Sequence, residues 1–367
     1  MNRITRGLIS LDWALVLVPA LLVSVGLVMI FTLGQAQNRP ELFLSQLIYA
    51  TMAVFVYGTA AAIDYRIWQN SAWLLYGLGI LLLVLVLVIG QAQFGAQRWI
   101  SLGSFQLQPA ELMKAILLFG LARLLANRTG DIGWWRYGLV LGLAALPSLL
   151  VLAQPDLGSA LVLIGLSIAL LFASRLSRRE LVASLLVVVV TLTLGWLSLR
   201  DYQRVRIESF LHRSRASQAA NYNVEQSMIA VGSGGLTGAG IGRGSQSQLN
   251  FLPVAHTDFM FATFAEATGL LGASTLLLCY GLIIWRSWRI ALLSRDSFAM
   301  LVGVGVGTVV LIQVGINVGM NIGLVPVAGI PLPLVSHGGS SLLVTALLLG
   351  ILQSMYRRCA RQRLVVS

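Results

Sequence analysis

The stretch that decides the fold is Trp13–Leu33, WALVLVPALLVSVGLVMIFTL, which has no charged side chain over 21 residues. A helix needs roughly 20 apolar residues to cross the hydrocarbon core of a bilayer. The stretch follows a short basic segment, Met1–Arg6, and it is longer than the apolar core of a secretory signal peptide. The sequence therefore predicts a first membrane span that is retained.

Composition extends this prediction to the whole chain. Of the 367 residues, 57% are hydrophobic and only 10% are charged, whereas soluble domains carry roughly 25% charged residues. This number of charged residues is too small to cover the water-facing surface of a soluble protein of this size. We therefore predict an all-α, polytopic integral membrane protein that forms a single membrane domain. Ten transmembrane helices are predicted, at 13–33, 42–63, 72–90, 109–126, 138–153, 157–174, 181–199, 258–285, 299–322 and 338–356.

The basic residues predict the topology. The chain has 25 basic and 13 acidic residues, a net charge of +12. If both termini are cytoplasmic, sixteen basic residues fall in inner loops and tails, and the short outer loops keep only Arg39 and Arg98. This distribution follows the positive-inside rule. No basic stripe is interleaved with aromatic residues, so nucleic acid is not expected as a partner.

One large extracytoplasmic loop, residues 200–257, is predicted between spans seven and eight. Its first half, Arg200–Val231, is expected to hold a helix near the lipid headgroups. Its second half is rich in glycine but contains no complete GxGxxG motif. The default interpretation of these glycines is a flexible loop.

Ionisable side chains at membrane depth need a structural or functional reason. Glu111 and Lys114 are three residues apart, share a helix face and are expected to pair inside the bundle. Two interpretations stay open, a structural ion pair and a cation that meets a phosphate group. For Asp156 the alternatives are capping of span six and a functional role at the outer face.

The sequence His256-Thr257-Asp258 places three polar groups where the large loop enters span eight. Capping is one interpretation of Asp258, but a carboxylate at the mouth of an apolar bundle favours a general base. Glu266 is predicted to lie roughly 12 Å deeper along the same helix and to support packing through an interhelical hydrogen bond.

The stretch Gly323–Pro333 contains three prolines and cannot form a regular helix. Irregular backbone at membrane depth is tolerated only where it lines a cavity or packs inside the protein. It is followed by Ser336 and His337, and all three histidines of the chain fall on the predicted outer side. The polar groups therefore converge on the outer leaflet.

Several of these motifs, in this order along the chain, resemble the SEDS family (shape, elongation, division and sporulation). The matching stretches are Gln97–Ile100, Gln108–Lys114, Gln154–Gly158, Gln246–Pro253, His256–Phe259 and Pro331–Ser341. The Gln246–Pro253 stretch and the short C-terminal tail are most similar to the elongation member rather than to the division member. His337 stands where a tyrosine is common in the family.

The resemblance implies a peptidoglycan glycosyltransferase of the bacterial cytoplasmic (inner) membrane. It would polymerise lipid II on the outer face of this membrane, in partnership with a class B penicillin-binding protein and other elongation-complex membrane proteins. Asp258 would be the general base. The proposed substrate-binding residues are Lys114, Glu111, Arg98, Asp156, His256, Thr257, Arg243 and Ser336.

Within this set, Lys114 with Arg98 or Arg243 would stabilise the departing pyrophosphate. No cofactor is firmly predicted, and a divalent cation held by Asp156 and Asp258 is left open. Two other functions are considered for the chain. A lipid II flippase would use Glu111 and Lys114 for transport, and a non-catalytic scaffold for the penicillin-binding protein would not require Asp258.

Overall fold

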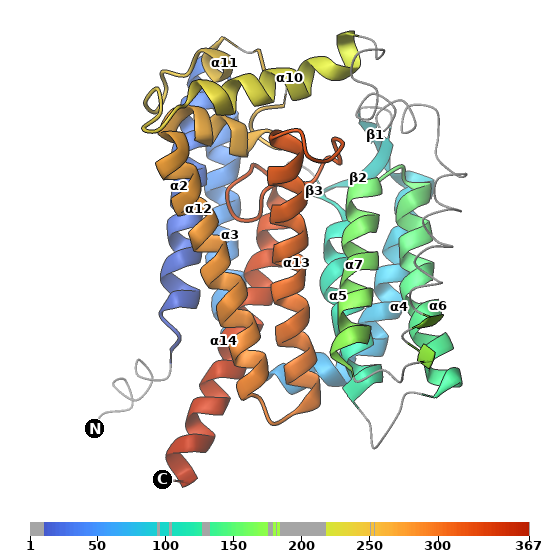
Figure 1. Cartoon of the computed structure of the whole chain (residues 1–367). Helices are drawn as coiled ribbons and strands as arrows, with labels where there is room; N and C mark the ends of the chain where they lie inside the picture. Colours follow the sequence, from blue (N-terminus) through green and yellow to red (C-terminus); the bar gives the residue numbers. More distant parts are fainter. Residues whose placement is uncertain are drawn as a thin grey trace.

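The protein folds into a bundle of long helices that run side by side (Figure 1). The computed structural model describes residues 11–93, 96–102, 105–126, 133–174, 179–180, 182–183, 218–249, 251–252 and 254–366. The helices long enough to cross the bundle are α2 (Ala14–Ala36), α3 (Glu41–Ala62), α4 (Tyr65–Ile89), α5 (Pro109–Ala126), α6 (Trp134–Ala153), α7 (Leu157–Ala173), α12 (Met260–Leu293), α13 (Ser297–Asn321) and α14 (Gly339–Val366).

Nine of the ten segments predicted as spans form helices. Seven of the described helices are long and apolar enough to cross a membrane, α5 and α7 not being among them. The helix α5 includes Glu111, Lys114 and Arg123, and α7 is 17 residues long. The helix α5 lies inside the bundle, where it packs against α4, α6, α7, α13 and α14, and α7 packs against α5, α6 and α13. The tenth predicted span, 181–199, lies outside the described residues except for positions 182–183.

A small antiparallel sheet interrupts the helical fold between α4 and α5. It consists of β1 (Gln91–Gln93), β2 (Ala96–Leu102) and β3 (Phe105–Leu107), with β2 in the centre. In the register, Gln91 pairs with Trp99, and Ile100 pairs with Leu107. The sequence prediction treated this connection as a plain loop. We call the end of the bundle that carries β1–β3 the sheet end (Figure 1).

The predicted helix in the large loop is confirmed in its second part. The helix α10 (Gln218–Ser233) lies across the sheet end of the bundle, followed by the short helix α11 (Ser245–Gln248) (Figure 1). It packs against α12, α13 and α11. Residues 200–217, the first part of the loop, lie outside the described residues.

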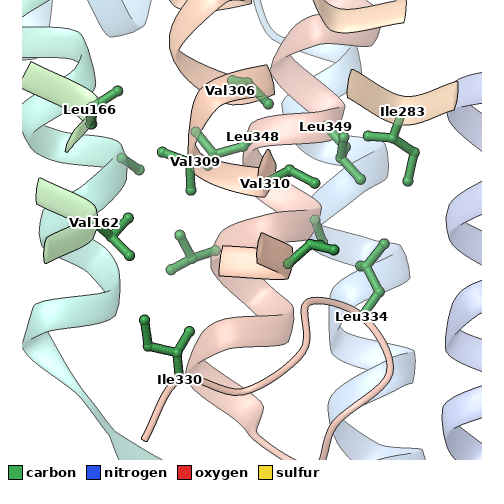
Figure 2. Close-up of a cluster of buried hydrophobic side chains, with 14 of the residues drawn as sticks. Val162, Leu166, Ile283, Val306, Val309, Val310, Ile330, Leu334, Leu348 and Leu349 are labelled. Carbon is green, nitrogen blue, oxygen red and sulfur yellow. The ribbon is translucent and has the colours of Figure 1, made fainter. Parts of the chain in front are cut away.

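The connection between α13 and α14 is irregular, as its prolines predicted, and its second half, residues 330–336, is largely buried inside the protein. Ile330 and Leu334 are buried and belong to the apolar cluster that also contains Val310 of α13 and Leu348 and Leu349 of α14 (Figure 2). This connection is anchored by apolar burial as well as by hydrogen bonds.

A close backbone contact holds the same connection against α2. A Cβ atom at Gly26 would collide with the carbonyl group of Val335. The buried hydroxyl of Tyr280 on α12 donates to the carbonyl of Pro333 at 2.5 Å. Gly26, which has no side chain, leaves room for the non-helical backbone inside the bundle, and Tyr280 donates a hydrogen bond to it.

The glycine-rich stretch after α10 is packed against α12, which corrects its interpretation as a flexible loop. The amide of Ala239 donates to the carbonyl of Glu266 at 2.9 Å, and the amide of Gly240 donates to that of Ala267 at 3.0 Å. A side chain at Gly238 would collide with the carbonyl of Ala267. Glycine is needed here because two backbones touch.

The partner of this contact is a break inside α12. Gly269 has φ 67° and ψ −165°, which no helix permits. After the break, the amide of Leu270 donates to the carbonyl of Gly235 at 2.9 Å. The break divides α12 into a short first part, which carries Glu266, and a long second part.

The variant Gly269→Ala should destabilise the protein. A Cβ atom at this position would collide with the amide nitrogen of Gly238, and φ lies in the left-handed region. Strain of this kind costs roughly 1–3 kcal/mol. The measurement is the thermal unfolding midpoint of purified protein in detergent.

The matched control is Gly281→Ala, on the same helix, where a Cβ atom would meet nothing within 4 Å. Alanine favours a helix by about 1 kcal/mol over glycine, so this variant should be as stable as wild type or more so. Equal destabilisation by both variants would contradict the account of the break.

Candidate functional site

Three consecutive carbonyl groups, those of His256, Thr257 and Asp258, are each held by a hydrogen bond. The carbonyl of His256 accepts from the amide of His337 at 2.8 Å. That of Thr257 accepts from the hydroxyl of Ser336 at 2.6 Å. These contacts, with those of Asp258, fix the backbone of the segment that was predicted to carry the general base.

The carbonyl of Asp258 is held by two asparagines of α13. The side-chain amides of Asn317 and Asn321 donate to it at 3.1 and 3.0 Å. Asn317 also donates to the carbonyl of Ile330 at 2.7 Å. Our sequence analysis missed both residues. The available signal was a row of three amide side chains, Gln313, Asn317 and Asn321, spaced four residues apart on a largely apolar helix.

The carboxylate of Asp258 lies in the turn before α12. The N-cap of α12 is Phe259, so Asp258 precedes the capping position. Asp258 is half-buried, and a Cβ atom at Gly329 would lie 3.8 Å from its Oδ2 atom. Gly329 has φ 67°. A glycine in the left-handed region thus leaves space beside the carboxylate.

A pair of histidines flanks this segment. The rings of His256 and His337 are 5.7 Å apart and edge-on, and Oγ of Ser45 on α3 is 2.9 Å from Nε2 of His337. Burial, with smaller effects of His256 and Arg39, lowers the pKa of His337 to about 4. Burial and Arg39 also lower the pKa of His256. Both rings are therefore neutral near pH 7.

Asp156 caps α7, which confirms the capping interpretation of this residue. Its Oδ1 atom accepts from the amide of Ser159 at 3.1 Å, and its Oδ2 atom accepts from Gln108 at 3.0 Å. Arg98 on β2 lies 4.0 Å from Oδ1 and donates to the carbonyls of Gln154 and Pro155. Asp156 therefore joins the sheet, α5 and α7.

Glu111 and Lys114 form the predicted ion pair. The Nζ atom of Lys114 is 2.5 Å from Oε1 of Glu111, and the two side chains are only 1% and 3% exposed. The pair lies on the central helix α5, facing the interior. Both charges are neutralised by each other, because a single buried charge would be very costly.

Glu266 holds a helix end, which confirms its predicted packing role. Its two carboxylate oxygens accept from the amides of Gln246 and Ser247 at 2.8 and 3.1 Å, at the start of α11. Arg243 lies on the exposed turn before α11. Within the described residues, no hydrogen bond or ion pair joins its side chain to the groups around Asp258 or Asp156.

The expected depth of Glu266 is wrong. Asp258 follows Thr257, whose carbonyl contacts Ser336, and the neighbouring Val335 touches Gly26 of α2. The turn before α11, which contacts Glu266, instead touches Thr32, which is nearer the sheet end of α2. Glu266 is therefore closer to the sheet end than Asp258. The chain rises toward that end before the break in α12, so a continuous descending helix was the wrong assumption.

The residues form two groups that meet at the connection between α13 and α14. The first contains Asp258, His256, Thr257 and Ser336, and the second contains Asp156, Arg98 and Gln108. Residues 328–330 lie between them, since Gly158 touches Ala328 and Ile330 while Gly329 approaches Asp258. Ser340 on α14 joins the second group by accepting from the amide of Gln108 at 3.0 Å.

The divalent cation that was left open between Asp156 and Asp258 finds no support in this arrangement. Both carboxylate oxygens of Asp156 already accept hydrogen bonds. Within the described ranges, no three His, Cys, Asp or Glu side chains gather as a metal site would require. We derive no step through a metal ion.

The lowered pKa of His337 predicts that acid destabilises the protein. Between pH about 6.5 and about 4, the unfolded chain binds a proton at this residue that the folded protein does not bind, so the free energy of unfolding falls as pH falls. The variant His337→Gln cannot titrate and should lose less stability between about pH 7 and about pH 5. The measurement is the unfolding midpoint of both proteins across this range.

His256 has the same sign of shift and remains in both proteins, so the difference between them isolates His337. Equal losses of stability in wild type and His337→Gln would show that His337 does not titrate in this window.

The family of the chain follows from comparison with known proteins. Residues 8–360 match the model of the FtsW/RodA/SpoVE family, described as cell cycle protein. The chain is 38% identical to the peptidoglycan glycosyltransferase MrdB of Escherichia coli K12, over 93% of this chain and 92% of that protein. It is 34% identical to the stage V sporulation protein E of Bacillus subtilis, over 95% and 97%.

Two solved structures have the same fold. The rod shape determining protein RodA of Thermus thermophilus is 32% identical, with a TM-score of 0.72 over 95% of this chain and 97% of that one. A chain of a peptidoglycan synthase complex, described by its coordination of polymerisation and crosslinking, is 32% identical, with a TM-score of 0.80 over 95% and 98%. The chain therefore belongs to the FtsW/RodA/SpoVE family of cell cycle proteins, which is the SEDS family that its motifs resemble.

Proposed function

We propose that this protein is a peptidoglycan glycosyltransferase that polymerises lipid II, with Asp258 as the general base. The relatives named peptidoglycan glycosyltransferase support the activity. One observation carries the assignment of the base. Asp258 has a half-buried carboxylate on a backbone that four side-chain and main-chain donors hold in place, as a preorganised base requires.

In the proposed reaction, a hydroxyl of the acceptor sugar attacks the anomeric carbon of the donor. The new bond joins this oxygen and carbon, and the bond from the carbon to the pyrophosphate oxygen breaks. Asp258 takes the hydroxyl proton, and the lipid pyrophosphate leaves with the electron pair. The transition state is expected to resemble an oxocarbenium ion.

The negative charge on the departing pyrophosphate needs cations. Arg98 is proposed for this role because its side chain is 23% exposed and belongs to the group that meets residues 328–330. Arg243 is a second candidate on the exposed turn before α11. Lys114 is neutralised by Glu111, so it would contribute only if the substrate takes part of this ion pair.

The remaining substrate contacts are proposed from the groups already described. His256 and Thr257 precede the base, and Ser336 holds the carbonyl of Thr257. Asp156 would act through Arg98, which it helps to hold. The neutral ring of His256 would offer the substrate a hydrogen bond rather than a charge.

We further propose that the sheet end faces the periplasmic side of the bacterial inner membrane, with both termini cytoplasmic. Support comes from the arginines, because the predicted inner loops hold most of them, and from the gathering of the polar groups near the sheet end. The relative from a peptidoglycan synthase complex supports a class B penicillin-binding protein as partner, together with other membrane proteins of the elongation complex.

A flippase remains the second candidate because of one observation, the ion pair Glu111–Lys114 inside the bundle. Buried ionisable groups are typical of transport pathways. The two groups around Asp258 and Asp156 favour the enzyme instead, because a transporter needs no base. A protein that served only as a scaffold would not require the carboxylate of Asp258 to be held beside Gly329.

Asp258→Asn and Asp258→Ala should abolish polymerisation. A general base contributes roughly 10²–10⁴-fold to the rate, and asparagine keeps the size of the side chain but cannot accept the proton. The measurement is the rate of glycan-strand formation from purified lipid II, with and without a chelator for the wild type.

The matched control is Asp296→Asn, at the N-cap of α13, where asparagine caps as well as aspartate. This variant should polymerise at the wild-type rate. Polymer formation by Asp258→Asn at that rate would remove Asp258 as the base.

The ion pair allows its two interpretations to be separated. Lys114→Met should destabilise the protein by roughly 3–5 kcal/mol, because it leaves the carboxylate of Glu111 buried without its partner. The double variant Glu111→Gln/Lys114→Met should recover most of the stability but remain inactive, if Lys114 meets substrate. Unfolding midpoints and polymerisation rates are measured on the same preparations.

Recovery of both stability and polymerisation in the double variant would mean that the pair is purely structural. Recovery of neither would mean that the two replacement side chains do not pack in the space of the ion pair.

A further inference from the structure

Asn321 is the residue through which three elements meet. It is fully buried at the end of α13. Its Nδ2 atom donates to the carbonyl of Asp258 at 3.0 Å, and its Oδ1 atom accepts from the amide of Ala262 at 3.1 Å. One side chain thus holds the backbone on both sides of the start of α12.

The third element is α10, which lies across the sheet end. Ser227 of α10 is fully buried, and its hydroxyl lies 2.8 Å from the carbonyl oxygen of Asn321 and 3.3 Å from its Oδ1 atom. The hydroxyl has one proton, which these two acceptors share. A hydrogen-bonded path from α10 to the backbone of Asp258 therefore passes through Asn321.

We propose that Ser227, Asn321 and Asn317 are positioning residues, and that together they couple the docking of α10 to the placement of Asp258. This inference rests on the proposed role of Asp258 as the base. It adds a function for α10, which is to keep the base aligned.

Two features of the geometry support coupling rather than simple packing. The carbonyl of Asp258 accepts from both Asn317 and Asn321, so its position depends on the last turns of α13. In addition, the side chain of Asn321 donates to the main-chain carbonyl of Asn317 at 2.7 Å, so it is tied to the turn of α13 that carries Asn317. A shift of α10 that withdraws Ser227 would act on this turn and on the carbonyl of Asp258.

The kinetic consequence is specific. Misplacement of a catalytic group by about 1 Å can reduce the rate about 100-fold. Loss of coupling should therefore lower kcat and leave KM for lipid II nearly unchanged. A purely structural role would instead lower the unfolding midpoint and the fraction of active protein, with kcat per active molecule preserved.

The test measures kcat and KM for lipid II in single and double variants. Asn321→Ala should lower kcat about 10- to 100-fold and Ser227→Ala about 3- to 10-fold, with KM within about twofold of wild type. The double variant Ser227→Ala/Asn321→Ala should be no slower than Asn321→Ala alone, because Ser227 acts through Asn321. Asn317→Ala should resemble Asn321→Ala.

The controls come from the same helix. Ser233→Ala removes a hydroxyl of α10 that donates to the carbonyl of Ala230 in the same helix at 2.8 Å, and it should leave kcat unchanged. Ser227→Thr retains the hydroxyl and should recover most of the activity lost in Ser227→Ala. If Asn321→Ala does not fold, these serine variants still decide the matter.

Wild-type kcat in Ser227→Ala would overturn the coupling, and so would effects of Ser227→Ala and Asn321→Ala that multiply in the double variant. These failures differ from failure of the proposed function. If Asp258→Asn polymerises lipid II normally, the function assigned to Asp258 is wrong. If Asp258→Asn is inactive while Ser227→Ala is normal, only the coupling is wrong.

Discussion

Backbone carbonyl groups that leave the helical pattern inside a membrane protein must find donors within the protein, because lipid offers none. This constraint organises the region around Asp258. The carbonyls of His256, Thr257 and Asp258 are met by donors from the α13–α14 connection and from α13. Non-helical backbone whose carbonyl groups all accept hydrogen bonds holds its side chain in a fixed position.

The membrane spans could be predicted from the sequence because lipid imposes a one-dimensional rule of length and hydropathy on each helix. The contacts between elements could not be. Gly238 seemed to lie in a flexible loop because its partner, Ala267, lies across a break that hydropathy does not register. Likewise, Glu266 was assigned the wrong depth. The prediction assumed one continuous helix, whereas the break at Gly269 separates the short part that carries Glu266 from the long second part.

The candidate site was predicted in part. Charged residues in apolar stretches drew attention to Asp258, Asp156 and the pair Glu111–Lys114, and the last three have the partners expected of capping or pairing. The amides that hold the site escaped notice. Asparagine carries no charge, and its role depends on which carbonyl groups its side chain contacts. For Asn317 these contacts are visible only in the folded structure.

The contact between Ser45 and His337 joins positions 292 residues apart in the sequence. A residue of different size or hydrogen-bonding character at position 337 changes the space and the partner available at position 45. The two positions are therefore expected to change together during evolution. A tyrosine at position 337 would be larger than the histidine and would carry its polar atom farther from the backbone, so it would need a different partner at position 45 on α3.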